Sequence, residues 1–191
     1  MDYKGDIYYI EQVLAGKNNA FGYIVDQHKN NAFNLAFRIC GNHEEAEELA
    51  QDSFLKAYRA LNSFKMKSSF ATWFYRIVYN TTISHVRLKK KGVLSLEDFP
   101  ADATDFIGTN TNEEEAEKEY RNSLVNFALQ KITEEERGLI SLYYYEDMST
   151  DEIADVTGIS KSNIKVRLFR ARKKMQEIIE KTEKKKLIYH E

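Results

Sequence analysis

The sequence predicts an all-α protein of two small helical domains joined by an acidic linker. Apolar residues recur at intervals of three and four positions on both sides of the middle of the chain. The segment 92–112 between them holds the only proline, two glycines and no periodic apolar pattern. At 191 residues and 42% hydrophobic content, the chain suits two compact units. We therefore expect a domain over 1–91, a linker over 92–119 and a domain over 120–191.

Two helices are expected in the first part of the N-terminal domain. The first keeps one apolar face and ends at Gly41, because glycine adopts the positive φ of a helix exit without strain. Asn42 with Glu45 caps the next helix. The apolar face of the first helix consists of Phe21, Ile24, Val25, His28, Ala32, Leu35, Ala36 and Ile39. The apolar face of the second consists of Ala46, Leu49, Ala50, Phe54, Ala57, Tyr58 and Leu61.

The outward face of the second helix is acidic. Carboxylates repel nucleic acid and attract a cationic partner, so this face is a candidate protein interface. His43 and Glu47 lie one turn apart, but no second pair accompanies them, which argues against a metal site. The residues of this face are Glu44, Glu45, Glu47, Glu48, Gln51 and Asp52.

A third helix is expected from about Ser69 to Lys91. We expect its core face to hold Phe70, Trp73, Ile77 and Val78. Beside that face lie aromatic and polar side chains, and the helix ends in cations, a combination that can hold a phosphate backbone and stack unpaired bases. A buried aromatic stripe with a basic last turn is the plainer alternative. The candidate strand contacts are Tyr75, Tyr79 and Asn80, with Arg76, Arg87 and Lys89 on the backbone.

The C-terminal domain is expected to begin with the acidic run Glu113–Glu119, which favours a helix N-terminus. Later, Ser149 and Glu152 form a capping box for a short helix, and Gly158 supplies a helix exit. Ser160 then caps a second helix. The apolar positions of that second helix are Ile164, Leu168, Ala171 and Met175.

The remaining face of that last helix is cationic. Two capped helices joined by so short a corner, with the basic run on the second helix only, predict a helix-turn-helix that places its second helix in the DNA major groove. A helical hairpin with a solvated basic face is the alternative. The cations are Lys161, Lys165, Arg167, Arg170, Arg172, Lys173 and Lys174.

The net charge of −2 hides two blocks of opposite sign. From Ile159 onward, eleven Lys and Arg stand against four Asp and Glu, a charge of +7. From Gly92 to Glu119, nine acids stand against Lys118, a charge of −8. Such blocks indicate separate roles. The single cysteine, Cys40, cannot form an internal disulfide, and no run suits a membrane span or a signal peptide, so we expect a cytoplasmic protein without membrane insertion.

An enzyme is disfavoured. We find no Ser/His/Asp set, no Gly-rich phosphate loop and no metal-ligand cluster, and we expect no cofactor. The four histidines, His28, His43, His85 and His190, are scattered and are expected to be structural or exposed. A free-standing helix-turn-helix regulator with an N-terminal sensing domain remains the alternative, but it would need a pocket with convergent polar groups, which the pattern does not indicate.

These segments, in this order, resemble the bacterial RNA polymerase sigma factors of the extracytoplasmic-function group. Gly41–Phe54 looks like the region-two helix that docks on the polymerase, and Phe70–Lys91 like the segment that recognises and melts the −10 element. Ile132–Arg137 and Met148–Arg172 look like region four, which binds the −35 element. The resemblance spans about Ala20–Ile179.

The resemblance implies partners and site residues. The partners are core RNA polymerase and promoter DNA, and an anti-sigma factor is a further candidate. The acidic face of the second helix would bind polymerase. The implied −35 contacts are Lys161, Ser162, Asn163, Lys165, Arg167, Phe169 and Arg170. The implied −10 contacts are Lys65, Lys67, Tyr75, Arg76, Tyr79, Asn80, Arg87 and Lys89.

Two features are individual to this chain within the resemblance. Ser84 stands where the group often has an aspartate, three residues before Arg87. The loop Lys65–Ser69, which in the family helps select a flipped −10 base, also has its own sequence. Both bear on promoter preference.

Overall fold

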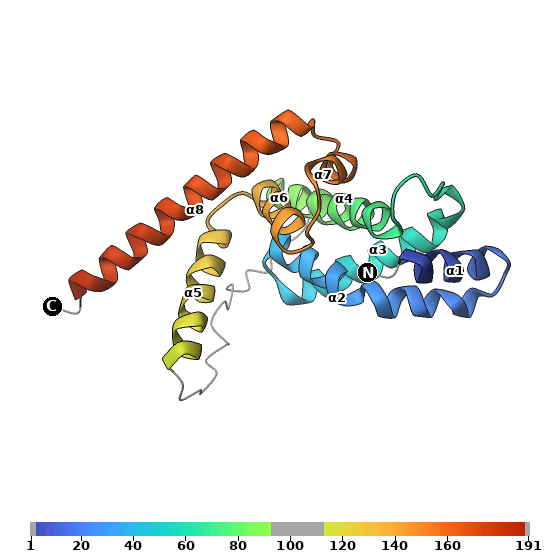
Figure 1. Cartoon of the computed structure of the whole chain (residues 1–191), viewed down its shortest axis with the longest axis horizontal. Coiled ribbons are helices and arrows are strands. Elements are labelled where there is room, and N and C mark those ends of the chain that lie inside the picture. The colour runs from blue at the N-terminus through green and yellow to red at the C-terminus, as the bar shows by residue number, and fades with distance from the viewer. Residues whose placement is uncertain (1–2, 93–112, 190–191) are drawn as a thin grey trace.

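The computed structural model describes residues 3–92 and 113–189, and within these ranges all regular structure is helical (Figure 1). The expected linker therefore lies, apart from its two ends, outside the described residues. The all-α expectation is confirmed for the described part of the chain. The helices are α1 (Tyr3–Leu14), α2 (Phe21–Cys40), α3 (His43–Ala60), α4 (Phe70–Lys90), α5 (Glu113–Gln130), α6 (Glu134–Tyr144), α7 (Thr150–Thr157) and α8 (Lys161–Tyr189), with short 3₁₀ turns at Asn18–Ala20 and Leu61–Ser63.

Helices α2, α3 and α4 pack on one another as the core of the N-terminal half. The expected boundaries follow from local chemistry. Gly41 ends α2 at φ 77°, and the side chain of Asn42 accepts a hydrogen bond from the Glu45 amide at 2.9 Å. Ser69 caps α4 in the same way through the Thr72 amide at 3.0 Å. Apolar side chains at helical spacing meet inside, where Phe70 and Phe74 are fully buried.

Helix α1 precedes every helix expected from the sequence. Ile10 and Val13 are buried and anchor it to the bundle. A polar contact adds to this packing, because Asp6 Oδ1 lies 3.0 Å from Nε2 of the buried His28. The expectation that His28 is a structural histidine on the apolar face of α2 is thus confirmed.

The C-terminal half contains the expected corner. Capping boxes start both α6, at Thr133 and Glu136, and α7, at Ser149 and Glu152. Gly158 ends α7 at φ 72°. Helix α8 then begins at Lys161, directly after the expected cap. Its apolar positions are buried as expected: Ile164, Leu168, Ala171 and Met175.

The two halves share one continuous core in addition to their own packing. Helix α6 contacts α2, and α7 contacts α4, so the helix-turn-helix lies against the N-terminal bundle (Figure 1). Helices α5 and α8 extend away from that bundle (Figure 1). At the contact, Gly138 of α6 faces the ring of Tyr79 so closely that an added Cβ would lie 2.6 Å from Cε2. Among the described helices, none is long and apolar enough to cross a membrane.

Candidate nucleic-acid and polymerase interfaces

Helix α8 presents an exposed polar and cationic face. Ile164 and Leu168 bury one side of the helix and thereby fix the other side outward. Phe169 is 62% exposed, more than any other large apolar residue in the described part of the chain. Four of its cations are engaged. Lys161 Nζ lies 2.6 Å from Asp151, Arg167 lies 3.0 Å from Glu135 and Lys174 lies 3.4 Å from Glu136. Arg172 donates a hydrogen bond to the Tyr144 hydroxyl at 3.0 Å. The exposed members of the predicted −35 set are Lys161, Ser162, Asn163, Lys165, Phe169 and Arg170.

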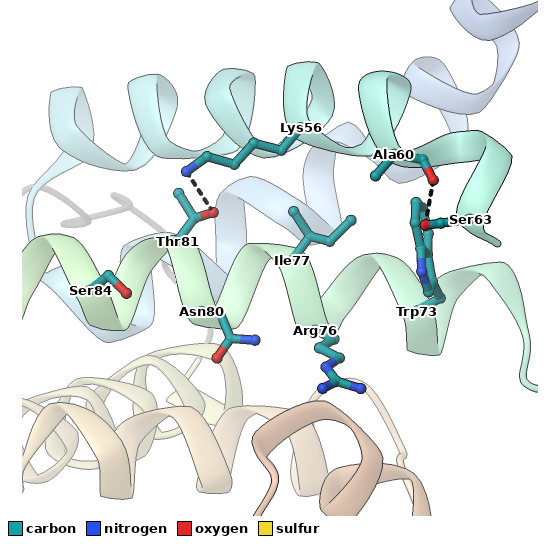
Figure 2. Close-up of a pocket in the computed structure, with 9 residues that line it drawn as sticks. All are labelled: Lys56, Ala60, Ser63, Trp73, Arg76, Ile77, Asn80, Thr81 and Ser84. Atoms are coloured by element: carbon teal, nitrogen blue, oxygen red, sulfur yellow. Dashed lines mark hydrogen bonds between the residues drawn. The ribbon is translucent and has the colours of Figure 1, made fainter.

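A groove of about 500 Å³ lies between α3 and α4 (Figure 2). Trp73 forms an apolar wall and is itself held against Phe64, with ring centroids 5.3 Å apart. Figure 2 shows Ile77 and Thr81 between the two helices, while Arg76 and Asn80 extend from the side of α4 that points away from α3. The full lining is Lys56, Ala60, Ser63, Trp73, Arg76, Ile77, Asn80, Thr81 and Ser84.

The chemistry of this groove suits a single-stranded nucleic acid. Aromatic side chains stack on unpaired bases, and cations at the rim hold phosphates. Arg76 and Asn80 are exposed, and Lys56 donates to the Thr81 hydroxyl at 3.2 Å. Lys65 and Lys67 are exposed on the preceding loop, where Met66 has a positive φ of 55°. Lys56 was not predicted as a groove residue, although its position one turn before Ala60 on the same face was a usable signal.

The assignment of faces on α4 was wrong in one respect. Trp73, expected in the core, is only partly buried and lines the groove, whereas Tyr75 and Tyr79, expected on the surface, are 3% and 5% exposed. The physical reason is that α6 and α7 cover the side of α4 that a separate N-terminal domain would leave free. In this arrangement Tyr75 and Tyr79 cannot stack on bases.

Polar contacts hold these two tyrosines. The Tyr75 hydroxyl donates to Glu146 Oε2 and accepts from Asn31 Nδ2 at 3.0 Å. Burial and the neighbouring Glu146 carboxylate raise the pKa of Tyr75. Burial also raises the pKa of Tyr79 to about 12, with a further contribution from Glu135. Both hydroxyls therefore stay protonated at neutral pH.

The basic end of α4 meets acidic side chains. Arg87 lies 2.6 Å from Glu135, and Lys90 lies 2.8 Å from Glu134, both in the first turn of α6. Lys89 pairs instead with Glu45 of α3. Of the predicted −10 cations, Arg87 and Lys89 are therefore engaged within the chain, while Lys65, Lys67 and Arg76 are exposed.

Most of the predicted acidic face of α3 is exposed, with one exception. Glu45 turns toward α4, where His85 Nε2 lies 3.1 Å away and Lys89 donates a hydrogen bond. Burial opposes ionisation of Glu45, but these hydrogen bonds outweigh it and lower its pKa. The exposed members are Glu44, Glu47, Glu48, Gln51 and Asp52. His43 and Glu47 are 3.7 Å apart, and no cluster of three metal-ligating side chains occurs among the described residues.

Comparison with known proteins agrees with this architecture. Family models named Sigma-70 region 2 and Sigma-70, region 4 match residues 24–92 and 124–175. The chain is 31% identical to the ECF RNA polymerase sigma factor SigW of Bacillus subtilis, over 87% of this chain and 92% of the relative. It is 28% identical to the RNA polymerase sigma-H factor of Pseudomonas aeruginosa, over 90% of this chain and 92% of the relative.

Solved structures share the fold. The structure of CnrH in complex with the cytosolic domain of CnrY has a TM-score of 0.66 at 23% identity, covering 92% of this chain and 97% of that chain. The sigma factor RpoE from Bartonella quintana, in complex with the anti-sigma factor NepR, has a TM-score of 0.66 at 22% identity, covering 85% of this chain and 98% of that chain.

A helical region-two domain followed by a region-four helix-turn-helix defines a transcription initiation factor. The chain belongs to the extracytoplasmic-function group of bacterial RNA polymerase sigma factors. It binds core RNA polymerase and directs promoter-specific initiation through recognition of the −10 and −35 elements.

Proposed function

We propose that the exposed face of α8 contacts the −35 duplex. Lys161, Ser162 and Asn163 lie at the N-terminal end of the second helix of the corner, which is the end that reaches base edges in this motif. Lys165 and Arg170 hold phosphates on either side, and Phe169 offers an apolar contact. Arg167 joins this set when it is released from Glu135.

We propose that the α3/α4 groove receives an unpaired base of the −10 element. Trp73 is the stacking wall, and Asn80 offers an amide to a base edge. Arg76, with Lys65 and Lys67 of the preceding loop, holds the backbone. Four further residues of the −10 set can contact DNA only after their present partners within the chain move away. These residues are Tyr75, Tyr79, Arg87 and Lys89. Ser84 at the groove rim replaces a carboxylate with a small hydroxyl, which favours a broader choice of base.

The exposed carboxylates of α3 are proposed to dock on a basic helical surface of core polymerase. Glu44, Glu47, Glu48 and Asp52 are exposed, so they raise the association rate by long-range attraction. Glu45 supports the interface from within by holding α3 against α4 through Lys89.

We infer that the protein has no catalytic activity and needs no cofactor, since its surfaces offer recognition rather than reacting groups. Region two would occupy 1–91, the linker 92–119 and region four 120–191, all in the cytoplasm with polymerase and DNA. Since RpoE was solved with an anti-sigma factor, we also propose an anti-sigma partner. Such a partner would abolish run-off transcription when added to the reconstituted system.

One observation carries this proposal: a single chain presents both an exposed cationic face on the second helix of a helix-turn-helix and a groove suited to an unpaired base. Core polymerase reconstituted with this chain should initiate at defined sites, and the transcripts, once sequenced, should share upstream −10 and −35 sequences. Core polymerase without this chain should not initiate at these sites. A free-standing regulator would leave the start sites of core polymerase unchanged.

The −35 assignment is tested within the same system. Lys165→Ala plus Arg170→Ala should lower −35 duplex binding and reduce the log–log salt slope by about 0.9 for each phosphate that is no longer neutralised. Lys181→Ala plus Lys184→Ala removes the same charge farther along α8, from exposed positions, and is the matched control. If the two double substitutions lowered −35 duplex binding equally, Lys165 and Arg170 would not be −35 contacts.

A further inference from the structure

Helix α1 lies before residue 24, where the match to region two begins, and it contributes no residue to the three proposed interfaces. It packs on α2, on α4 and on the 3₁₀ turn Leu61–Ser63, which leads to the loop Lys65–Ser69 (Figure 1). Its apolar anchors are Ile10 and Val13. Asp6 lies one turn before Ile10 on the same face, so a carboxylate is also directed into the bundle.

The Asp6 carboxylate fixes the ring of His28 on α2. His28 Nε2 donates to Asp6 Oδ1 at 3.0 Å, because a carboxylate can only accept. The other ring nitrogen, Nδ1, is buried and has no hydrogen-bond partner in the part of the chain that the structure describes. The orientation of this buried ring therefore depends on a single polar contact, which comes from α1.

His28 begins a row of aromatic rings that ends at the α3/α4 groove. The centroid of the His28 ring lies 5.3 Å from that of Phe70, the first residue of α4. The Phe70 ring lies 5.8 Å from that of Phe64 and 5.6 Å from that of Trp73, the apolar wall of the groove. We call these four side chains the aromatic row. Because protein interiors are closely packed, a shift of the first ring is passed to the last.

The aromatic row also closes the loop that precedes α4. Phe64 is the residue before this loop and Phe70 the residue after it, and both are buried. Their rings meet edge to face, at an interplanar angle of 86°. The loop carries Lys65 and Lys67, two of the proposed phosphate contacts. The aromatic row therefore fixes the base of the loop and the wall of the groove together.

We propose that Asp6 is a positioning residue for −10 recognition, which acts through His28 and the aromatic row to hold Trp73 where it stacks on an unpaired base. This inference rests on the proposed function of the α3/α4 groove. Asp6 does not touch DNA in this role. Without its hydrogen bond, the His28 ring is free to turn and Trp73 loses its fixed support. Base stacking then weakens, while Arg76 still holds the backbone.

An abasic strand separates these two effects, because it keeps every phosphate and lacks one base. The probe is a single strand with the −10 sequence of this chain's own transcripts, made abasic at each position in turn and titrated into the holoenzyme. In the wild type, loss of the base that occupies the groove should weaken binding about 5- to 150-fold, the usual contribution of one stacked base.

Asp6→Ala should weaken binding of the intact strand about 2- to 10-fold, the range expected for one hydrogen bond. It should weaken binding of the strand that lacks the groove base much less, since that strand has no base to stack. The two changes are therefore expected to be non-additive. Asp6→Asn keeps a carbonyl oxygen that can accept from His28, so it should restore most of the affinity for the intact strand.

Two matched variants of α1 separate positioning from a general loss of stability. Glu11→Ala removes the same charge from an exposed position. Val13→Ala shortens a buried anchor of α1 but leaves the Asp6–His28 hydrogen bond in place. Glu11→Ala should bind both strands as the wild type does. Val13→Ala should lower the melting temperature of the chain, and any change in its DNA binding should be equal for the intact and the abasic strand.

Tryptophan fluorescence gives a second readout, because Trp73 is the only tryptophan of the chain. In the free full-length chain, Asp6→Ala should move the Trp73 emission to longer wavelength as the ring becomes more hydrated. Asp6→Asn and Val13→Ala should keep the wild-type emission. Circular dichroism and −35 duplex binding show that each variant is folded. His28→Gln removes the ring itself, so it should behave as Asp6→Ala does and provides the test if Asp6→Ala does not fold.

Equal losses of affinity for the intact and the abasic strand in Asp6→Ala would overturn the positioning role. The same holds if Val13→Ala reproduces the selective loss or the shift in emission. Failure of the proposed function looks different, because the wild-type holoenzyme would then bind the intact strand and every abasic strand alike. That result would reject the groove as a base site, and the positioning role with it.

Discussion

Single residues on α4 decide what this helix can bind. Within about two turns, Trp73 and Arg76 line the groove while Tyr75 and Tyr79 face the C-terminal half. A stacked base gains roughly 1–3 kcal/mol from an aromatic side chain. That gain is available at once to Trp73, whereas the two tyrosines must first lose Glu146 and Gly138 as neighbours.

The prediction for a single residue concerns Arg76, which lines the α3/α4 groove. Arg76→Ala should weaken −10 single-stranded binding and reduce its log–log salt slope by about 0.7, because one phosphate of the strand is no longer neutralised. Titration of a labelled oligonucleotide across salt measures both quantities, and −35 duplex binding should be unaffected. Arg59→Ala, at an exposed position on α3 outside the groove, is the control. An identical response of Arg59→Ala would show a general charge effect instead.

Helix α3 serves two purposes through two faces. Glu45 is directed to α4 and stabilises the bundle through Lys89 and His85. Glu47 and Glu48 are exposed one to one and a half turns before Asp52, and they form a surface of one charge. Charges of one sign on a rigid helix act mainly on the rate of association.

Reversal of two of these charges is the test at the scale of the element. Glu47→Lys plus Glu48→Lys should slow association with core polymerase severalfold at low salt, and the difference should shrink as salt screens the attraction. Stopped-flow or surface-binding kinetics would measure the rate. Glu177→Lys plus Glu183→Lys makes the same charge change at exposed positions of α8 and should leave the association rate near that of the wild type. Wild-type kinetics in the α3 variant would leave this face without a role in docking.

At the scale of the whole molecule, two carboxylates of α6, Glu134 and Glu135, join the two halves beside the apolar core that the halves share, and both must be ionised to do so. The hydrogen bond from Arg87 lowers the pKa of Glu135 from its ordinary value of 4.5. Burial opposes ionisation of Glu134, but the hydrogen bond from Lys90 and the other favourable contacts outweigh it and lower the pKa of Glu134. The pKa of Glu136 is lowered as well, but its partners Thr133 and Lys174 lie in the C-terminal half, so Glu136 does not join the two halves. Glu134 and Glu135, with their lowered pKa values, stabilise the contact between the two halves fully above pH 4.5, and this contribution is lost as the pH falls through the lowered values. The facing cations are Arg87, Lys90, Arg137, Arg167 and Lys174.

The contact between the two halves should therefore weaken in acid before the helices melt. We expect the radius of gyration to rise as the pH falls below 4.5, the ordinary value for these carboxyls, while the helical circular dichroism signal is retained. Gly138→Ala should show a smaller rise, because its added Cβ would lie 2.6 Å from the Tyr79 ring and would already weaken the contact between α6 and α4. A radius that stays constant until the helical signal falls would mean that these ion pairs do not hold the two halves together.

The sequence by itself determined α2, α3, α4, the acidic start of α5 and the corner between α7 and α8. Stops and caps such as Gly41, Gly158 and the box at Ser149 act within a few residues, so local chemistry suffices to place them. Helical periodicity also identified which residues share a face. It could not tell how many neighbours cover each face, because this depends on contacts between residues far apart in the chain. Only the tertiary structure decided that α6 and α7 bury Tyr75 and Tyr79, and that Glu135 bridges α4 and α8.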